Sequence, residues 1–108
     1  MEVETAALRQ SRQRRSGRFL KGPIPLPPIA AAARLPGQAL AVLLATHHQV
    51  ALTGRPSVSL PAALLREFGV SRDAKARALH QLERAGLIRV ERAPGRAAWV
   101  GLSGQLRS

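Results

Sequence analysis

The segment FGVSRDAKARALHQLERAGLI, residues 68–88, decides the fold. Ser71 is a favourable N-cap, because its side-chain oxygen can accept an N–H of the first helical turn. Gly86 stands where a left-handed residue commonly ends a helix. At about 100° per residue, the apolar side chains between these two positions gather on one face. That face holds Ala74, Ala78, Leu79, Leu82 and Ala85. We therefore predict a short amphipathic helix over residues 71–85.

The opposite face of this predicted helix is polar and largely charged. It carries Arg72, Asp73, Ala76, Arg77, His80, Gln81, Glu83 and Arg84. Lys75 departs from the pattern, since it projects from the apolar stripe and its charge opposes the helix dipole. We expect its aliphatic stem to lie along the stripe and its ammonium group to reach the rim of the helix.

A β-hairpin is predicted immediately after the helix. Residues 87–92 show partial strand alternation, residues 93–96 (APGR) have the composition of a turn, and residues 97–102 form a second strand. Trp99 is expected in the core, where its ring would fix the hairpin against the helices.

Three further elements are predicted before the deciding segment. Residues 37–52 (GQALAVLLATHHQVAL) are apolar nearly all round, which predicts a buried helix that ends near Thr53-Gly54. Residues 57–60 alternate polar and apolar side chains and predict a short strand. Residues 61–68 predict a second helix, which begins at a proline and ends before a glycine.

Two adjacent histidines, His47 and His48, lie near the end of the first of these helices. Neighbouring helical side chains point about 100° apart, so the two imidazoles are poorly placed to bind one metal ion. We expect both to be structural and predict no metal site.

The N-terminal third differs in composition from the rest. Residues 1–22 hold six basic residues against two glutamates, which predicts a disordered or weakly helical basic tail. Four prolines in residues 23–28 (PIPLPP) predict an extended connector with Ile24 and Leu26 packed inward. Pro28 is expected in the first turn of a short helix over residues 29–34.

These features predict four regions: a tail over residues 1–22, a proline-rich connector and short helix over 23–35, one folded domain over 36–102, and a second tail over 103–108. A chain of 108 residues fits one domain.

The absence of cysteine excludes disulfides and thiolate metal sites. With neither a secretion signal nor an apolar run of about 20 residues, the expected location is the cytoplasm.

The formal net charge of +11 favours a polyanionic partner. Phe19, Phe68 and Trp99 are the only aromatic residues. Proteins that bind single strands usually stack bases on several aromatic side chains, so this composition favours duplex DNA over single-stranded nucleic acid.

The predicted order of elements resembles that of the winged helix-turn-helix proteins, especially bacterial transcription regulators of the MarR and GntR kind. The resemblance covers about residues 36–102 and is strongest over residues 78–88 (ALHQLERAGLI). The resemblance also rests on Val58-Ser59-Leu60, Leu64-Leu65, Phe68-Gly69-Val70-Ser71-Arg72, and Arg92 through Gly95-Arg96. It implies an α+β fold, mainly α with a small β-hairpin, in which a three-helix core carries a wing.

The resemblance also implies roles for individual residues. The helix 71–85 would enter the major groove and the wing, residues 88–102, would lie on the DNA backbone. Arg77 is the candidate for a bidentate guanine contact, and Asp73 either accepts from a cytosine amino group or pairs with Arg77. The full set of predicted DNA-binding residues is Ser71, Arg72, Asp73, Lys75, Ala76, Arg77, His80, Arg84, Arg92 and Arg96. A basic arm along the phosphates would add Arg9, Arg12, Arg14, Arg15 and Arg18.

Enzymatic function is not predicted. Asp73 is the only aspartate, and no carboxylate pair, Ser-His-Asp set or glycine-rich phosphate loop is recognisable. We expect no cofactor and no small-molecule ligand. The favoured interpretation is a nucleoid-associated, repressor-like transcriptional regulator that binds double-stranded DNA in a sequence-specific manner. A homodimer formed through residues 19–52 is expected, since paired modules read paired half-sites.

Three alternatives stay open at this point. A winged helix can serve as a protein–protein adaptor, a basic chain can bind RNA or the ribosome, and plasmid or phage replication and partition proteins share the fold. An exposed apolar face on the helix 71–85 would favour the adaptor.

Overall fold

Helix α5, Arg72–Arg84, forms where the sequence predicts it, to within one residue at each end. The Ser71 hydroxyl accepts the Ala74 N–H at 3.2 Å, which is the expected N-cap bond. At the other end Gly86 has a φ of 77°. The Gly86 and Leu87 N–H groups donate to Glu83 and Leu82, both at 3.0 Å, which closes the helix in a Schellman motif.

The same capping chemistry ends helix α4, Ala62–Glu67. The Gly69 and Val70 N–H groups donate back to Arg66 and Leu65 at 3.0 and 2.9 Å. The tight connection between α4 and α5 follows from this motif, since Gly69 adopts a φ of 72° that other residues rarely tolerate. The predicted helix over residues 61–68 is confirmed in place and is one residue shorter at each end.

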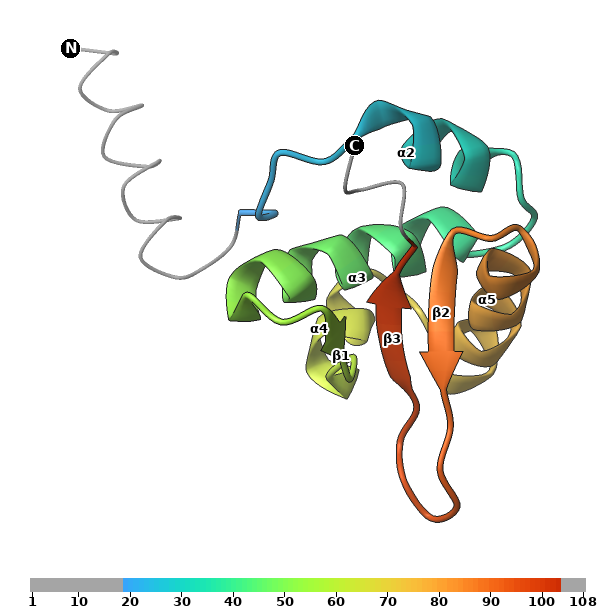
Figure 1. Ribbon diagram of the computed structural model, residues 1–108. Helices are drawn as coiled ribbons and strands as arrows, with labels where there is room; N and C mark the ends of the chain where they lie inside the picture. The colour runs from blue at the N-terminus through green and yellow to red at the C-terminus, as the bar shows by residue number, and fades with distance from the viewer. Residues whose placement is uncertain (1–18, 104–108) are drawn as a thin grey trace, which may run out of the picture.

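The computed structural model describes residues 19–103. Within them the chain forms four helices and one antiparallel sheet of three strands in the order β1-β3-β2. Helix α3, Ala39–Thr53, runs through the centre, and α2, Leu26–Ala33, packs on it (Figure 1). No helix in this part of the chain is both long enough and apolar enough to span a membrane.

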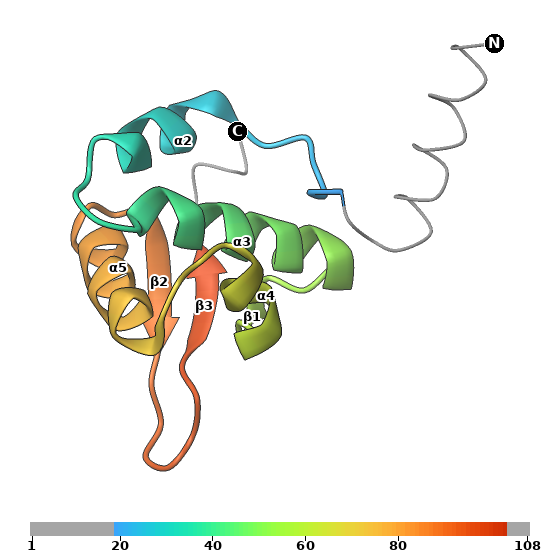
Figure 2. The same ribbon diagram turned by 180° about the vertical axis from the view of Figure 1, so that it is seen from behind.

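The three strands are shorter than predicted. Strand β1 is Ser57–Val58 instead of residues 57–60, because Ser59 and Leu60 lead into Pro61, which has no N–H for a ladder. Strands β2, Ile88–Glu91, and β3, Trp99–Leu102, pair with Val90 opposite Val100. The hairpin loop therefore spans residues 92–98, longer than the predicted turn. Figures 1 and 2 show this loop projecting from the end of the molecule opposite α2.

The proline-rich segment contradicts its prediction in two ways. Helix α2 begins at Leu26, within the segment expected to be extended, because prolines fit a first helical turn where no N–H partner is required. Leu26 is 74% exposed and does not pack inward. Pro28 and Ala32 are the residues of α2 that are buried.

Helix α3 begins two residues later than predicted, since Gly37 takes a left-handed φ of 71° and Gln38 is the N-cap. Its predicted end is confirmed: Gly54 is left-handed and its N–H donates to Val50 at 2.8 Å.

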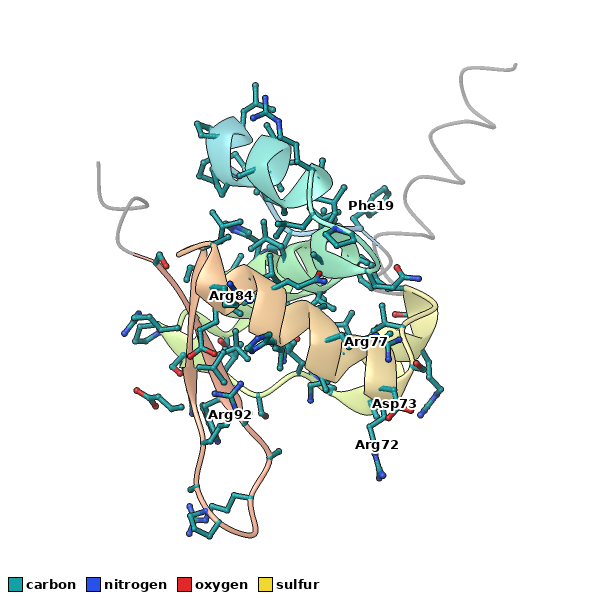
Figure 3. The ribbon with its side chains drawn as sticks, turned by 90° about the vertical axis from the view of Figure 1, so that its right-hand side faces the viewer. Phe19, Arg72, Asp73, Arg77, Arg84 and Arg92 are labelled. Atoms are coloured by element: carbon teal, nitrogen blue, oxygen red, sulfur yellow. The ribbon has the colours of Figure 1, made fainter. Side chains whose placement is uncertain are left out.

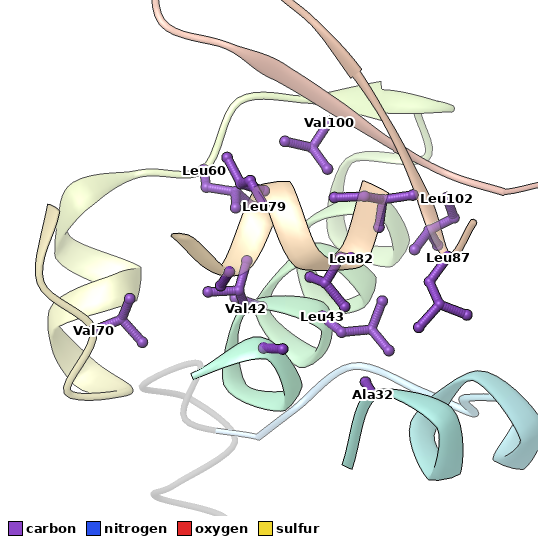
Figure 4. Close-up of a cluster of buried hydrophobic side chains, with 14 of the residues drawn as sticks. Ala32, Val42, Leu43, Leu60, Val70, Leu79, Leu82, Leu87, Val100 and Leu102 are labelled. Atoms are coloured by element: carbon purple, nitrogen blue, oxygen red, sulfur yellow. The ribbon is translucent and has the colours of Figure 1, made fainter. Parts of the chain in front are cut away.

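The hydrophobic core lies between α3, α5 and the inner face of the sheet (Figure 4). Leu43 and Val42 of α3, Leu82 of α5 and Val100 of β3 are its largest fully buried apolar side chains. Trp99 is not part of it. The prediction that its ring fixes the hairpin to the helices is wrong, because Val100 and Leu102 supply that contact and Trp99 is 38% exposed.

Candidate nucleic-acid interface

The polar face of α5 is turned to solvent, as the helical periodicity predicts. Its exposed residues are Ser71, Arg72, Asp73, Ala76, Arg77, His80 and Arg84, whereas Ala78, Leu79 and Leu82 are buried. Figure 3 shows the labelled arginines of α5 directed away from the core. The apolar stripe is narrower than predicted, since Ala85 is exposed at the C-cap.

Asp73 and Arg77 do not form the alternative ion pair. The structure gives neither residue an ion pair or a side-chain hydrogen bond within residues 19–103. Arg72, beside them at the start of the helix, is likewise unpaired within these residues. The guanidinium groups of the first two turns are therefore available to an external anion, with their hydrogen-bond donors unoccupied by protein groups.

Lys75 lies between the two faces. Its side chain is half-buried, whereas those of Arg72 and Arg77 are exposed. Partial burial agrees with an aliphatic stem that lies along the apolar stripe. A phosphate contact by its ammonium group stays a prediction.

Arg92 has an internal partner that the sequence did not predict. Its Nη1 and Nη2 both lie 3.5 Å from Oε1 of Glu83, so the start of the hairpin loop is tied to the last turns of α5. The two side chains are 56% and 37% exposed. An exposed pair of this kind contributes about 0.2–1 kcal/mol. Nothing in the sequence signals it, because a separation of nine residues matches no helical or hairpin spacing.

Arg96 and Arg89 complete the basic side chains of the hairpin. Arg96 is exposed in the loop, where its N–H closes a turn to the Ala93 carbonyl at 3.1 Å. Arg89, which sequence reasoning missed, donates to the Leu102 carbonyl at 3.4 Å. A Cβ at Gly101, its partner in the ladder, would lie 3.0 Å from Nη2 of Arg89. A glycine opposite an arginine is the sequence signal that was available for this contact.

The N-terminal end of α5 and the hairpin loop face the same side of the molecule (Figures 2 and 3). Over its whole length α5, together with the loop 92–98, carries six basic residues and two acidic ones, Asp73 and Glu83. The basic members are Arg72, Lys75, Arg77, Arg84, Arg92 and Arg96. We call these eight residues the basic face. The predicted basic arm, Arg9 to Arg18, lies outside the described residues, as does the predicted tail over residues 103–108 except Ser103.

His47 and His48 take part in the fold in different ways. His47 is buried, its Nε2 has no hydrogen-bond partner, and burial lowers the pKa of its imidazole below the ordinary 6.5. Nδ1 of His48 accepts the Lys21 N–H at 2.9 Å, which holds the segment before α2 against α3. Across residues 19–103 no group of three His, Cys, Asp or Glu side chains is placed to hold a metal ion.

The lowered pKa of His47 predicts a loss of stability in acid. The unfolded chain binds a proton at about pH 6.5 and the folded protein only at lower pH, so folding competes with protonation. Stability should be constant above pH 6.5 and fall as the pH decreases from 6.5 toward the lowered pKa. Urea unfolding of the parent and of His47→Leu across this range measures the effect. The variant should lose less stability over this range than the parent, because it has no buried imidazole to protonate.

Comparison of the chain with protein-family models, with curated proteins and with solved structures gives no significant match.

Proposed function

We propose that the protein is a winged helix-turn-helix that binds double-stranded DNA, with α5 as the recognition helix. The observation that carries the proposal is the exposed, unpaired arginine face on the first turns of α5, beside a projecting basic loop. The major groove is ~12 Å wide and admits one α-helix. Helix α5 packs on α3 and β2, and α4 leads into it through the Gly69 turn, in the order of a helix-turn-helix.

The chain order and the sheet support this assignment. Helix α3, strand β1, helices α4 and α5, and the β2–β3 hairpin follow one another in the order that the resemblance implies. In this proposal the loop over residues 92–98 is the wing. Arg96, exposed on that loop, contacts a phosphate or the minor groove beside the groove that receives α5.

The individual roles follow from position on the helix. Arg77 reads a guanine through its two donors, with Arg72 beside it at the groove. Ala76 lets the helix approach closely because its side chain is small. Arg84, near the C-terminal end of α5, and Lys75 contact phosphates, which adds affinity without sequence information. His80 and Ser71 are further candidates for polar contacts at this surface.

The exposed face of α5 favours DNA over a protein partner. The exposed large hydrophobic side chains of residues 19–103 are Phe19, Leu20, Leu26, Leu52 and Trp99, none of which belongs to α5. A docking surface for a protein typically has an apolar centre. The exposed face of α5 therefore favours DNA as the partner, and the role that we propose there is that of a repressor-like regulator.

Competition between duplex DNA and structured RNA tests this function. Labelled duplex from a random pool is bound to the protein, and unlabelled duplex or a base-paired RNA hairpin is added at several salt concentrations. We expect duplex to compete more strongly and the affinity to fall with salt, since each phosphate contact releases counterions. Equal or stronger competition by RNA, or no binding at low salt, would contradict the proposal.

The exposed side chains of the N-terminal region support a homodimer. Four of the five exposed large hydrophobics, Phe19, Leu20, Leu26 and Leu52, fall within residues 19–52, the interval expected to form the interface. Sedimentation at micromolar concentration should give a dimer, and Leu52→Glu should shift the protein toward the monomer by placing a charge in the interface. If the parent protein is a monomer at this concentration, the dimer proposal is wrong and the protein binds DNA as single copies.

Releasing Arg92 from Glu83 is expected to strengthen duplex binding. Glu83→Gln removes an anion from the basic face and frees the arginine for phosphate. Because an exposed pair is worth ~0.2–1 kcal/mol, affinity should rise by up to about fivefold at moderate salt. Glu91→Gln is the matched control, since Glu91 is exposed on β2 and has no bond to Arg92. Equal gains in both variants, measured by fluorescence anisotropy, would assign the effect to net charge alone.

A further inference from the structure

A small hollow lies at the C-terminal end of α3, beside strand β1. It is lined by two residues of α3, the arginine of the following loop, the β1 region and the first residue of β3: Gln49, Thr53, Arg55, Val58, Ser59 and Trp99. Its volume is about 250 Å³. Pockets for drug-sized ligands measure roughly 300–1,000 Å³, so this one suits a single ring or a group of similar size.

The polar side chains of the hollow have unfilled hydrogen-bonding capacity. Within residues 19–103 the guanidinium of Arg55, the side-chain amide of Gln49 and the hydroxyl of Ser59 have no protein partner. The hydroxyl of Thr53, by contrast, is already hydrogen-bonded within the protein. It donates to the Gln49 carbonyl at 2.9 Å and accepts the Arg55 N–H at 3.3 Å. These two hydrogen bonds fix the backbone of the turn from which the Arg55 side chain extends.

The aromatic wall of the hollow is Trp99, the only tryptophan in the chain. It is 38% exposed although it stands in a strand next to a fully buried valine. An indole face left in contact with water is a platform for another flat ring, and stacking on it tolerates any base. The hollow thus offers one stacking surface, one cation and two neutral hydrogen-bonding side chains.

We propose that this hollow binds one nucleoside monophosphate unit. The base stacks on Trp99, Gln49 and Ser59 bond to its edge, and Arg55 pairs with the phosphate. The unit is either a free nucleotide or one nucleotide of a single strand. Proteins that carry long single strands stack several bases on several aromatics, whereas one tryptophan in a cavity of this size accommodates one base. None of the six lining residues belongs to the basic face, so the two sites can be tested with separate variants.

Fluorescence of Trp99 provides the measurement, since the chain has no tyrosine and no second tryptophan. The full chain is titrated with thymidine 5′-monophosphate, with thymidine, with inorganic phosphate and with a short oligothymidylate. We expect saturable quenching by the monophosphate, binding at least about fivefold weaker for thymidine because the phosphate is missing, and no quenching by phosphate. Tighter binding of the oligothymidylate than of the monophosphate identifies a single strand as the source; the reverse order identifies a free nucleotide.

Two arginine variants make the test specific. Arg55→Gln should weaken binding of the monophosphate by about five- to tenfold, because the charged donor to the phosphate is lost. Arg34→Gln, which removes the same charge from the exposed C-cap of α2, should bind like the parent. Absence of saturable quenching by both nucleotide probes, or equal affinity of parent and Arg55→Gln, would overturn the proposal.

Duplex affinity separates this site from the proposed function. Arg55→Gln should bind duplex within about twofold of the parent, and Arg77→Ala should retain quenching by the monophosphate. A parent protein that shows saturable quenching but binds no duplex rejects only the duplex function. The opposite result rejects only the nucleotide site.

Discussion

Replacing Leu82 with alanine is expected to lower the free energy of unfolding by about 2–5 kcal/mol, which is a large part of the ~5–15 kcal/mol typical of a small domain. Leu82 is fully buried on the inner face of α5, between α3 and the sheet (Figure 4). The substitution removes its packing contacts and leaves a cavity, because a helix capped at both ends cannot collapse onto the space.

Urea unfolding measures this effect as a decrease in the midpoint at constant slope. Leu26→Ala, compared at a protein concentration low enough to keep both variants monomeric, is the matched control, since the same atoms are removed from a side chain that is 74% exposed in α2. The control should change stability by no more than about 0.5 kcal/mol. Similar midpoints for the two variants would mean that α5 is not packed through Leu82 and that the orientation of its arginine face is wrong.

The ends of the helices were predictable because the chemistry that sets them is local. Ser71, Gly69, Gly86 and Gly54 each act on groups within five residues in the chain, so a reading of the sequence at that scale finds them. The exposed face of α5 follows from the same periodicity. The polar face of the candidate site was therefore available from the sequence, residue by residue.

The errors concern contacts between segments that are distant in the chain. Burial of Trp99 depended on which residues of β3 face the helices, and that choice is set by the pairing of β3 with β1 and β2. The bond of Arg92 to Glu83 depends on where the hairpin leaves the sheet. Leu26 was expected inside because apolar residues usually are, but the early start of α2 turns it outward. Tertiary placement decided the first two cases, and the local start of a helix decided the third.

The hollow beside Trp99 was missed for two reasons: its residues come from distant segments, and Trp99 was expected in the core. Gln49, Arg55 and Ser59 have no sequence pattern in common, and they meet because the end of α3 lies beside the edge strand of the sheet. With Trp99 assigned to the core, no sequence pattern indicated a ligand there. The indole of a lone tryptophan is apolar enough for a core and flat enough for a binding surface, so exposure alone distinguishes the two.

Arg77→Ala is expected to lower affinity for the preferred duplex by about ten- to a hundredfold, with little change for unrelated duplexes. A bidentate arginine–guanine contact is worth ~1–3 kcal/mol of discrimination, and each 1.4 kcal/mol is a factor of ten. Arg77 is exposed in the second turn of α5 and is not engaged by Asp73, so its truncation disturbs no internal bond. The measurement is selection of bound duplexes from a random pool, followed by titration of the selected and scrambled sequences.

Arg34→Ala distinguishes base recognition from charge. It removes one exposed arginine from the end of the molecule opposite the hairpin loop and should leave the selected sequence unchanged (Figure 1). For Arg77→Ala, we expect the preference at one or two base positions to disappear while weak binding to all duplexes remains, because phosphate contacts by Arg84 and Arg96 are retained. If Arg77→Ala selects the same sequence as the parent, Arg77 does not read bases. If it weakens all duplexes equally, its contact is to phosphate, and the discrimination must come from Arg72 or from the shape of the DNA.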